Sequence, residues 1–190
     1  MRLVVLITVI VALTVPSASR AQAPATSGPV VVFDTVKGTF EIELFQTDAP
    51  KSTAAILALV NKRFYNGLRV HRLVPGFVVQ FGDPQTRDMS RKALWGRQGS
   101  GTPVGAAEIS PKRPHRVGAV GLAHGGDPRT ADSQLYITLS GLENANVANI
   151  QSMNRYAVIG QVISGMDVVR KLQIPDVIRR ATVKAPSRGK

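Results

Sequence analysis

The stretch VHRLVPGFVVQFGD, residues 70–83, decides the fold of this 190-residue chain. Its apolar residues fall in two short runs with a Pro-Gly pair between them. Short apolar runs that are bounded by Pro and Gly are typical of β-strands separated by a turn. The stretch therefore predicts strands over residues 68–73 and 77–81.

Further short strands are predicted on both sides of this stretch. They cover residues 30–34, 39–44, 117–123, 135–139, 156–162 and 177–183. Helices are expected from Asp48-Ala49-Pro50, with Asp48 as candidate cap, to Asn61, and over residues 165–172. Residues 82–114 show little periodicity and predict an irregular excursion. Many short strands and two separate helices favour a closed β-barrel or sandwich over a repeating βαβ sheet.

The N-terminus has the layout of a secretory signal peptide. Arg2 precedes an apolar run from Leu3 to Val15, and Ser19-Arg20-Ala21 places small residues at the positions a signal peptidase reads. The run is shorter than the 18 or so apolar residues that normally span a bilayer. We expect export of a protein without stable membrane insertion, to the periplasm or outside the cell.

These segments predict four parts of the chain: a signal peptide over residues 1–21, a flexible lead-in over 22–29, one folded domain over 30–184, and a basic tail over 185–190. The pair Ala21-Gln22-Ala23 offers a second cleavage site, although Pro24 would then follow the cut. No apolar interface stripe is evident, so we expect a monomer.

Composition restricts the function classes. There are no cysteines, and His71, His115 and His124 lack ligand spacing, which predicts no metal and no cofactor. Without Arg2 and Arg20, 22 Lys+Arg stand against 12 Asp+Glu, a net charge of +10. The basic residues are scattered, which favours a solvated surface over nucleic-acid binding. Adhesion to an anionic polymer through this surface is a weaker alternative.

The stretch over residues 70–83 resembles the signature of the cyclophilins, with Arg72, Phe77 and Gln80 at the family's spacing. Residues 118–124 and 132–137 resemble its second signature, and residues 156–169 resemble its closing strand and helix. The resemblance covers about residues 30–183. It implies a mainly β fold, a closed eight-stranded antiparallel barrel capped by two helices.

The resemblance also implies peptidyl-prolyl cis-trans isomerase activity on proline-containing peptides, including exported proteins that are unfolded or folding. Arg72 and Gln80 are the implied catalytic residues. Arg72 would hydrogen-bond to the prolyl nitrogen of the twisted transition state, with Gln80 holding its spare donors. The implied substrate-binding residues are Phe77, Val78, Leu122, Ala123, His124, Gln134 and Tyr136.

The chain departs from the family pattern at the far wall of the implied site. Leu135-Tyr136 replaces the commoner Phe-Phe and adds a hydroxyl to the pocket wall. Residues 149–155 and then Tyr156 stand where many members have a tryptophan and a histidine. Trp95, the only tryptophan, lies in the excursion; we expect it to be a core anchor, with an exposed contact as the alternative. The alternative function is a binding module that holds proline-containing segments, or chaperones exported chains, without turnover.

Overall fold

The computed structural model describes residues 28–141 and 153–185. The predicted signal peptide, most of the lead-in and most of the basic tail lie outside the described residues, so these parts stay predictions. The strands and helices follow in chain order: β1 (Val30–Thr35), β2 (Gly38–Leu44), α1 (Pro50–Asn61), β3 (Arg72–Val74), β4 (Val78–Phe81), β5 (Ala119–Leu122), β6 (Leu135–Thr138), β7 (Val158–Ser164), α3 (Met166–Lys171) and β8 (Ile178–Val183).

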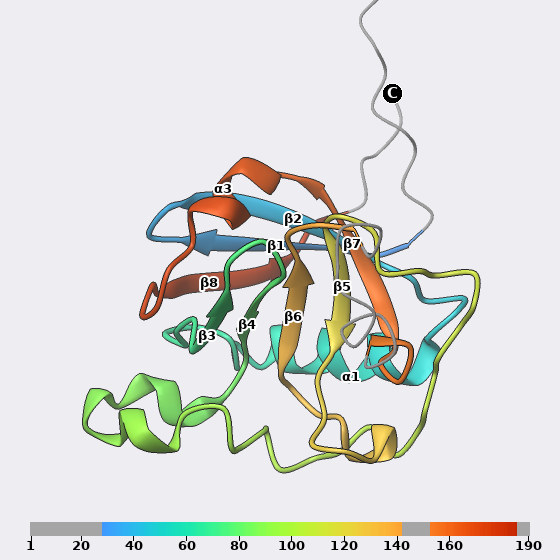
Figure 1. The fold of residues 1–190 in the computed structure, drawn as a ribbon, viewed down its shortest axis with the longest axis horizontal. Helices are drawn as coiled ribbons and strands as arrows, with labels where there is room; N and C mark the ends of the chain where they lie inside the picture. Colours follow the sequence, from blue (N-terminus) through green and yellow to red (C-terminus); the bar gives the residue numbers. More distant parts are fainter. Residues whose placement is uncertain (1–27, 142–152, 186–190) are drawn as a thin grey trace, which may run out of the picture.

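The eight strands form one curled antiparallel sheet in the order β3-β4-β6-β5-β7-β2-β1-β8 (Figure 1). The expected closed barrel is wrong, because the edge strands β3 and β8 share no ladder and the sheet is an open half-barrel. At this opening, the segment before β3 contacts the start of β8. There Gly67 N donates to Ile178 O at 2.8 Å, Ile178 N donates to Leu68 O at 2.8 Å, and Arg69 forms an isolated bridge with Val177.

This contact also explains why β3 differs from its predicted range. Val70 N still donates to Asp176 O at 2.9 Å, whereas His71 N donates to Gln80 O at 3.1 Å. The chain therefore changes neighbours between residues 70 and 71, from the side of β8 to β4. Only Arg72–Val74 belong to the ladder with β4.

An aromatic cluster fills the concave side of the sheet. Phe33 and Phe40 stack with ring centroids 5.2 Å apart, and Phe81 and Tyr65 meet Phe33 edge-on at 5.4 and 5.7 Å. All four side chains are at most 1% exposed. Aromatic pairs in these arrangements add to the stabilisation that apolar burial provides. Phe81 is thus a core residue.

Helix α1 packs against β8. Helix α3 packs against β2 (Figure 1). Asp48 was the predicted cap of α1, but it instead pairs with Arg113, with Oδ2 2.6 Å from Nη2. The first backbone N–H groups of α1 are satisfied by Glu108, whose carboxylate accepts from Lys51 N at 2.9 Å and Ser52 N at 2.7 Å. A residue of the distant excursion therefore caps the helix and also stabilises its dipole.

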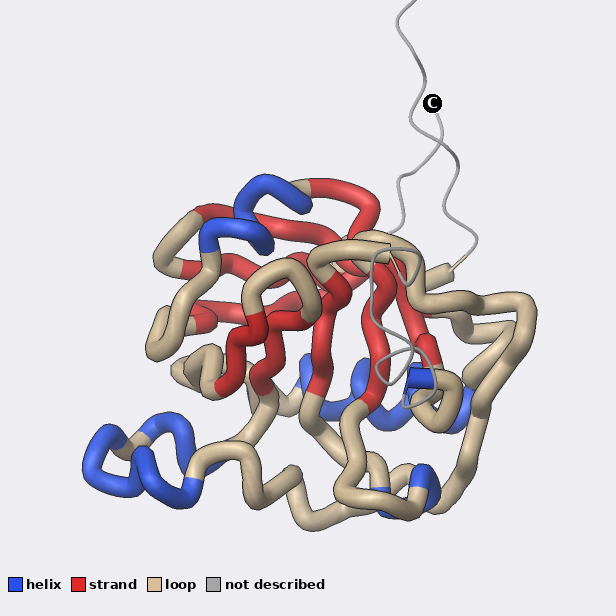
Figure 2. Tube along the Cα trace, viewed as in Figure 1, coloured by secondary structure: helices blue, strands red, loops and turns tan. Residues whose placement is uncertain are grey.

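The excursion between β4 and β5 contains the short 3₁₀ turns η1 (Pro84–Arg87) and η2 (Met89–Leu94), which project from the sheet (Figure 2). It then runs below the sheet and returns along one side to β5 (Figure 1). Trp95 ends η2 with its Nε1 donating to Asp88 O at 3.2 Å, outside the core clusters of the described residues. The expectation that Trp95 anchors the core is wrong.

Candidate active site

The register of four strands places the candidate residues in one row. Arg72 on β3 pairs with Gln80 on β4, Gln80 pairs with Tyr136 on β6, and Tyr136 pairs with Gly121 on β5. Directly paired residues of antiparallel strands have Cβ atoms about 4.5–5.5 Å apart. Residues far apart in the sequence thus become neighbours across the sheet.

Strand alternation separates this row from the core. On β4, Val79 and Phe81 face the aromatic core, while Val78 belongs to a second apolar cluster with Tyr136 and Met153. Side chains of successive strand residues point to opposite faces of a sheet. The candidate site and the core are therefore built on opposite faces of the same strands.

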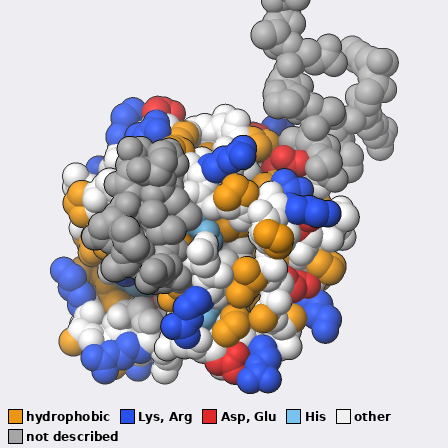
Figure 3. Space-filling view, turned by 45° about the vertical axis from the view of Figure 1, so that its right-hand side comes forward, with side chains coloured by type: hydrophobic (Ala, Val, Ile, Leu, Met, Phe, Trp, Pro, Cys, Tyr) orange, Lys and Arg blue, Asp and Glu red, His pale blue; other side chains and the backbone are white. Residues whose placement is uncertain are grey.

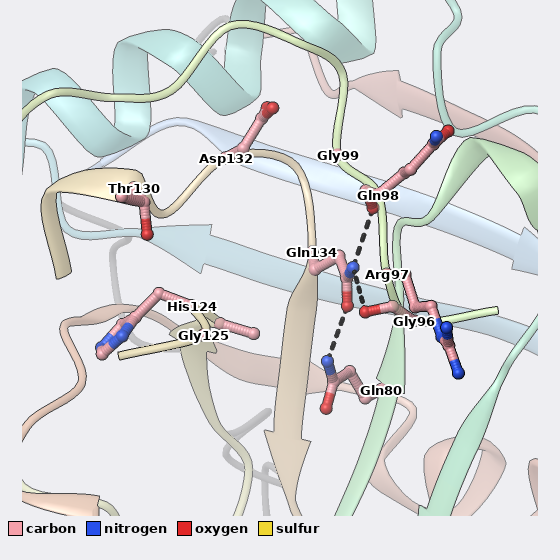
Figure 4. Close-up of a pocket in the computed structure, with 11 residues that line it drawn as sticks. Gln80, Gly96, Arg97, Gln98, Gly99, His124, Gly125, Thr130, Asp132 and Gln134 are labelled. Carbon is pink, nitrogen blue, oxygen red and sulfur yellow. Dashed lines mark hydrogen bonds between the residues drawn. The ribbon is translucent and has the colours of Figure 1, made fainter. Parts of the chain in front are cut away.

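A chain of hydrogen bonds runs from the backbone of the excursion to Arg72. Gln134 Nε2 donates to Gly96 O at 3.0 Å and to Gln98 O at 2.8 Å (Figure 4). Gln134 Oε1 accepts from Gln80 Nε2 at 2.8 Å, and Gln80 Oε1 accepts from Arg72 Nη1 at 3.2 Å. Because carbonyl oxygens can only accept, both amide groups have one allowed orientation. The guanidinium is thereby held through two side chains by fixed backbone.

The buried carboxylate of Asp83 fixes the backbone at the start of this chain. Asp83 is fully buried, and its Oδ2 accepts from Gly96 N at 2.6 Å, Arg97 N at 3.0 Å and Gln98 N at 3.3 Å. Its Oδ1 accepts from Gln85 N at 2.8 Å. A buried carboxylate is tolerated when backbone donors satisfy it, and here it closes the excursion onto the end of β4.

Beside Arg72 lies a hollow of about 190 Å³ with an apolar floor. Val78, Tyr136 and Met153 form its buried cluster, against which Phe77, Ala123 and Tyr156 are packed. The hollow is lined by Arg72, Phe77, Val78, Gln80, Ala123, His124, Tyr136, Met153 and Tyr156. A cavity with an apolar floor and one directed cation at its edge suits a small apolar ring that carries a polar group.

The far wall of the hollow is aromatic. Tyr156 meets Tyr136 edge-on with ring centroids 5.8 Å apart, and His124 stacks on Tyr156 at 4.2 Å. The His124 Nε2 lies 3.0 Å from Arg155 O. Behind the wall, Tyr136 Oη lies 2.7 Å from Nε2 of the buried His115.

A second hollow of about 420 Å³ continues from the first and shares Gln80, Ala123 and His124 with it. Its further lining comes from residues 96–99 and from Gly125, Thr130, Asp132 and Gln134 (Figure 4). The Asp132 carboxylate accepts from Ser100 Oγ at 2.5 Å and Gly101 N at 2.9 Å. Its charge thus holds the excursion in place. The two hollows adjoin at the three residues that they share, and together they are called the groove below.

The structure brings together most of the residues that the sequence predicts for the site. Leu122 is the exception: it is 1% exposed and belongs to the main core, so it does not line the rim. Alternation on β5 explains this, because Gly121 faces Tyr136 and its neighbour must face inward. Ala123 lies in the wall, but its N–H is already donated to Gln134 O at 2.8 Å.

The residues predicted for the site did not include Met153 or the backbone of Gly96–Gln98, and Tyr156 was placed at the far wall without an assigned role. The departure from the family pattern at Tyr156 is the signal that placed it there. Met153 has no comparable signal. The backbone carbonyls of residues 96 and 98 carry no sequence information at all, since every residue type has one.

Among the residues that the structure describes, no group of three or more His, Asp and Glu side chains could hold a metal ion. Within the same ranges, no helix has the length and apolar character needed to cross a bilayer. On the face that Figure 3 shows, the Lys and Arg side chains are spread over the surface in small groups.

Comparison with known proteins gives consistent results. The family model of the cyclophilin type peptidyl-prolyl cis-trans isomerases matches residues 30–188. A protein of Brucella suis named "Probable peptidyl-prolyl cis-trans isomerase" is 34% identical over 181 residues, which cover 94% of this chain and 88% of that protein.

Solved structures agree in fold. A cyclophilin type peptidyl-prolyl cis-trans isomerase of Cryptosporidium parvum superposes with a TM-score of 0.68 at 25% identity, covering 83% of this chain and 98% of that one. A structure of the same protein in the presence of the dipeptide ala-pro also has a TM-score of 0.68, at 24% identity, covering 82% and 99%. Family model, relative and fold agree that this chain belongs to the cyclophilin-type peptidyl-prolyl cis-trans isomerases.

Proposed function

We propose that this isomerase turns X–Pro bonds by donating a hydrogen bond from Arg72 to the prolyl nitrogen. The observation that carries the proposal is the oriented chain from the carbonyls of Gly96 and Gln98 through Gln134 and Gln80 to the guanidinium. This chain of hydrogen bonds holds Arg72 at the edge of the hollow. No nucleophile, metal or cofactor is needed for this chemistry.

The physics of the amide explains why one arginine suffices. Rotation about an X–Pro bond breaks amide resonance, which creates a barrier of about 18–20 kcal/mol. In the twisted transition state the prolyl nitrogen regains a basic lone pair. A guanidinium that donates to this lone pair binds the twisted form better than either planar form, and such differential binding accelerates rotation. Arginine remains charged at every physiological pH and has donors to spare for Gln80.

The hollow would hold the proline ring while the rest of the peptide follows the groove. Phe77 and the face of Tyr136 offer apolar surface of the right kind, over a buried floor that includes Val78. The N–H of Ala123 already donates to Gln134 O. The carbonyl of Ala123 and the backbone of His124 would therefore contact the substrate residues before proline. Gln80 could also reach the substrate backbone from the opposite side.

We further propose that the substrates are exported polypeptides. The support is the N-terminal sequence, with its positive start, short apolar run and small residues before the cleavage site. N-terminal sequencing of the protein recovered from the periplasm or the medium tests this: export predicts a chain that begins at Gln22. An intact Met1 on protein that stays in the cytoplasm would refute it.

A protease-coupled assay on a short Ala-Pro peptide tests the isomerase mechanism. We expect the mature protein to accelerate cis-to-trans conversion and Arg72→Ala to lose most of the acceleration. Arg180→Ala is a matched control, because Arg180 is an exposed arginine on β8, away from the site. Peptide binding without acceleration in the wild type would instead support the binding module. Binding to an anionic polymer that salt weakens and that survives Arg72→Ala would support surface adhesion.

A further inference from the structure

Tyr136 is a tyrosine at the wall of the hollow beside Arg72, and its hydroxyl faces away from that hollow. The side chain is 4% exposed, and its Oη lies 2.7 Å from Nε2 of His115. The two rings are nearly parallel, with an interplanar angle of 12° and centroids 5.9 Å apart. His115 is itself only 5% exposed. The hydroxyl is therefore satisfied inside the protein and leaves only carbon atoms at the wall.

The position of the Tyr136 ring depends on Gly121 of the neighbouring strand β5. A Cβ atom at Gly121 would fall 1.9 Å from Cζ and 2.0 Å from Oη of Tyr136. No side chain larger than hydrogen can therefore stand at residue 121 while the ring crosses β5. Together, Gly121 and His115 form a slot that accepts the hydroxyl end of the ring.

The backbone around His115 is tied to the strand that carries the tyrosine. Arg116 O accepts from Ala119 N at 2.9 Å and from the hydroxyl of Thr138, and Gly118 N donates to Thr138 O at 2.8 Å. Thr138 and Tyr136 are two residues apart on β6. The imidazole thus has a fixed position relative to the ring that it holds.

We propose that His115 is a positioning residue of the proline pocket, which keeps the Tyr136 hydroxyl behind the wall so that the pocket presents only the ring. This inference rests on the proposed function, because it assumes that the hollow beside Arg72 receives proline. Neither residue is an acid or base in the reaction. His115 does not line the hollow and acts through Tyr136 alone.

Both partners of the pair are neutral. Burial lowers the pKa of His115 to about 4, and burial raises the pKa of Tyr136 well above its ordinary value, with a smaller contribution from Tyr156. Without His115 the hydroxyl would be buried and unpaired, a state that proteins avoid. Tyr136 lines the hollow, so we expect the ring to tilt and bring its hydroxyl into the volume that proline needs.

A double-mutant cycle on peptide affinity tests the inference. We expect His115→Phe to raise KM for an Ala-Pro peptide, and Kd from an NMR titration, by about tenfold, with kcat changed less than twofold. In the Tyr136→Phe background there is no hydroxyl to misplace, so adding His115→Phe should change KM less than twofold. A role in folding alone would shift the melting temperature but leave KM unchanged per folded molecule.

A loss of affinity that is equal in both backgrounds, or absent from His115→Phe, would overturn the inference. If His115→Phe does not fold, His115→Gln and His115→Asn replace it. The glutamine amide reaches Oη and should keep KM within about twofold, whereas the shorter asparagine should reproduce the loss; equal KM values for the two would refute the positioning role. Wild-type turnover and its loss in Arg72→Ala test the proposed function separately in the same assay.

Discussion

The two sides of the groove are built differently. On the side of Arg72, each contact is a directed hydrogen bond that leads back through Gln80 and Gln134 to backbone carbonyls. On the far side, Tyr136 and Tyr156 meet by ring packing. The directed side has one allowed arrangement, whereas packed rings tolerate replacement by other rings. In this chain the polar side follows the family pattern and the aromatic side departs from it, which agrees with this difference.

Arg72→Lys tests the directed side most strongly. Lysine keeps the charge but lacks the planar fork that reaches Gln80 and the prolyl nitrogen together. Loss of a donor aimed at the transition state typically costs 10²–10³ in rate, so we expect kcat/KM to fall about 100-fold, with the loss in kcat. The protease-coupled assay measures this, with Arg180→Lys as control. A lysine variant with near wild-type kcat would show that charge alone suffices.

Gln134→Leu would break the hydrogen-bond chain one step further from the substrate. The leucine has similar volume but offers no oxygen to Gln80, so both Gln80 and Arg72 lose their fixed orientation. We expect kcat/KM to fall about tenfold, the effect of losing about 1.4 kcal/mol of orientation. Gln134→Glu should be worse, because its carboxylate would face Gly96 O and Gln98 O. If both variants retain full activity, Arg72 does not need this support.

Tyr156→Ala tests the packed side. Removing the ring takes away one wall of the hollow and the partner of His124, but no directed contact to Arg72. We expect KM to rise about three- to fivefold with kcat unchanged, in line with about 0.5–1.5 kcal/mol for an aromatic contact. Tyr156→Phe keeps the ring and serves as the control. A kcat effect larger than the KM effect would place Tyr156 in the chemistry instead.

The smallest expected effect is on acid stability. Burial lowers the pKa of His115 to about 4 from an ordinary value of 6.5, and burial also lowers the pKa of His71. As pH falls from about 6.5 toward 4, the unfolded chain binds protons that the folded protein excludes, so the free energy of unfolding decreases. Above pH 6.5 this effect vanishes.

Denaturant midpoints between pH 7 and pH 4.5 measure this loss. His115→Gln removes one of the two titrating groups, so its midpoint should fall less over this range than that of the wild type. Equal slopes for the two proteins would mean that His115 is not held neutral by burial.

Local pattern was sufficient for most elements of the fold. The alternation in residues 39–44 and the Asp-Ala-Pro start at residue 48 predicted β2 and α1 almost to the residue. Local pattern failed where contacts with a distant segment determine how a helix is capped or where a strand begins. Glu108 rather than Asp48 satisfies the start of α1, and the chain before Arg72 contacts the start of β8 rather than extending β3. Neither partner can be identified from residues that lie next to each other in the chain.

The sequence by itself determined the family, the strand pattern and the identity of Arg72, Phe77 and Gln80, because these depend on residue type and spacing. Only the tertiary structure decided that the sheet stays open between β3 and β8, that Leu122 faces the core, and that His115 meets the hydroxyl of Tyr136. Those outcomes depend on strand register and on contacts between distant segments. Register is set by packing of the whole sheet, which no short stretch of sequence encodes.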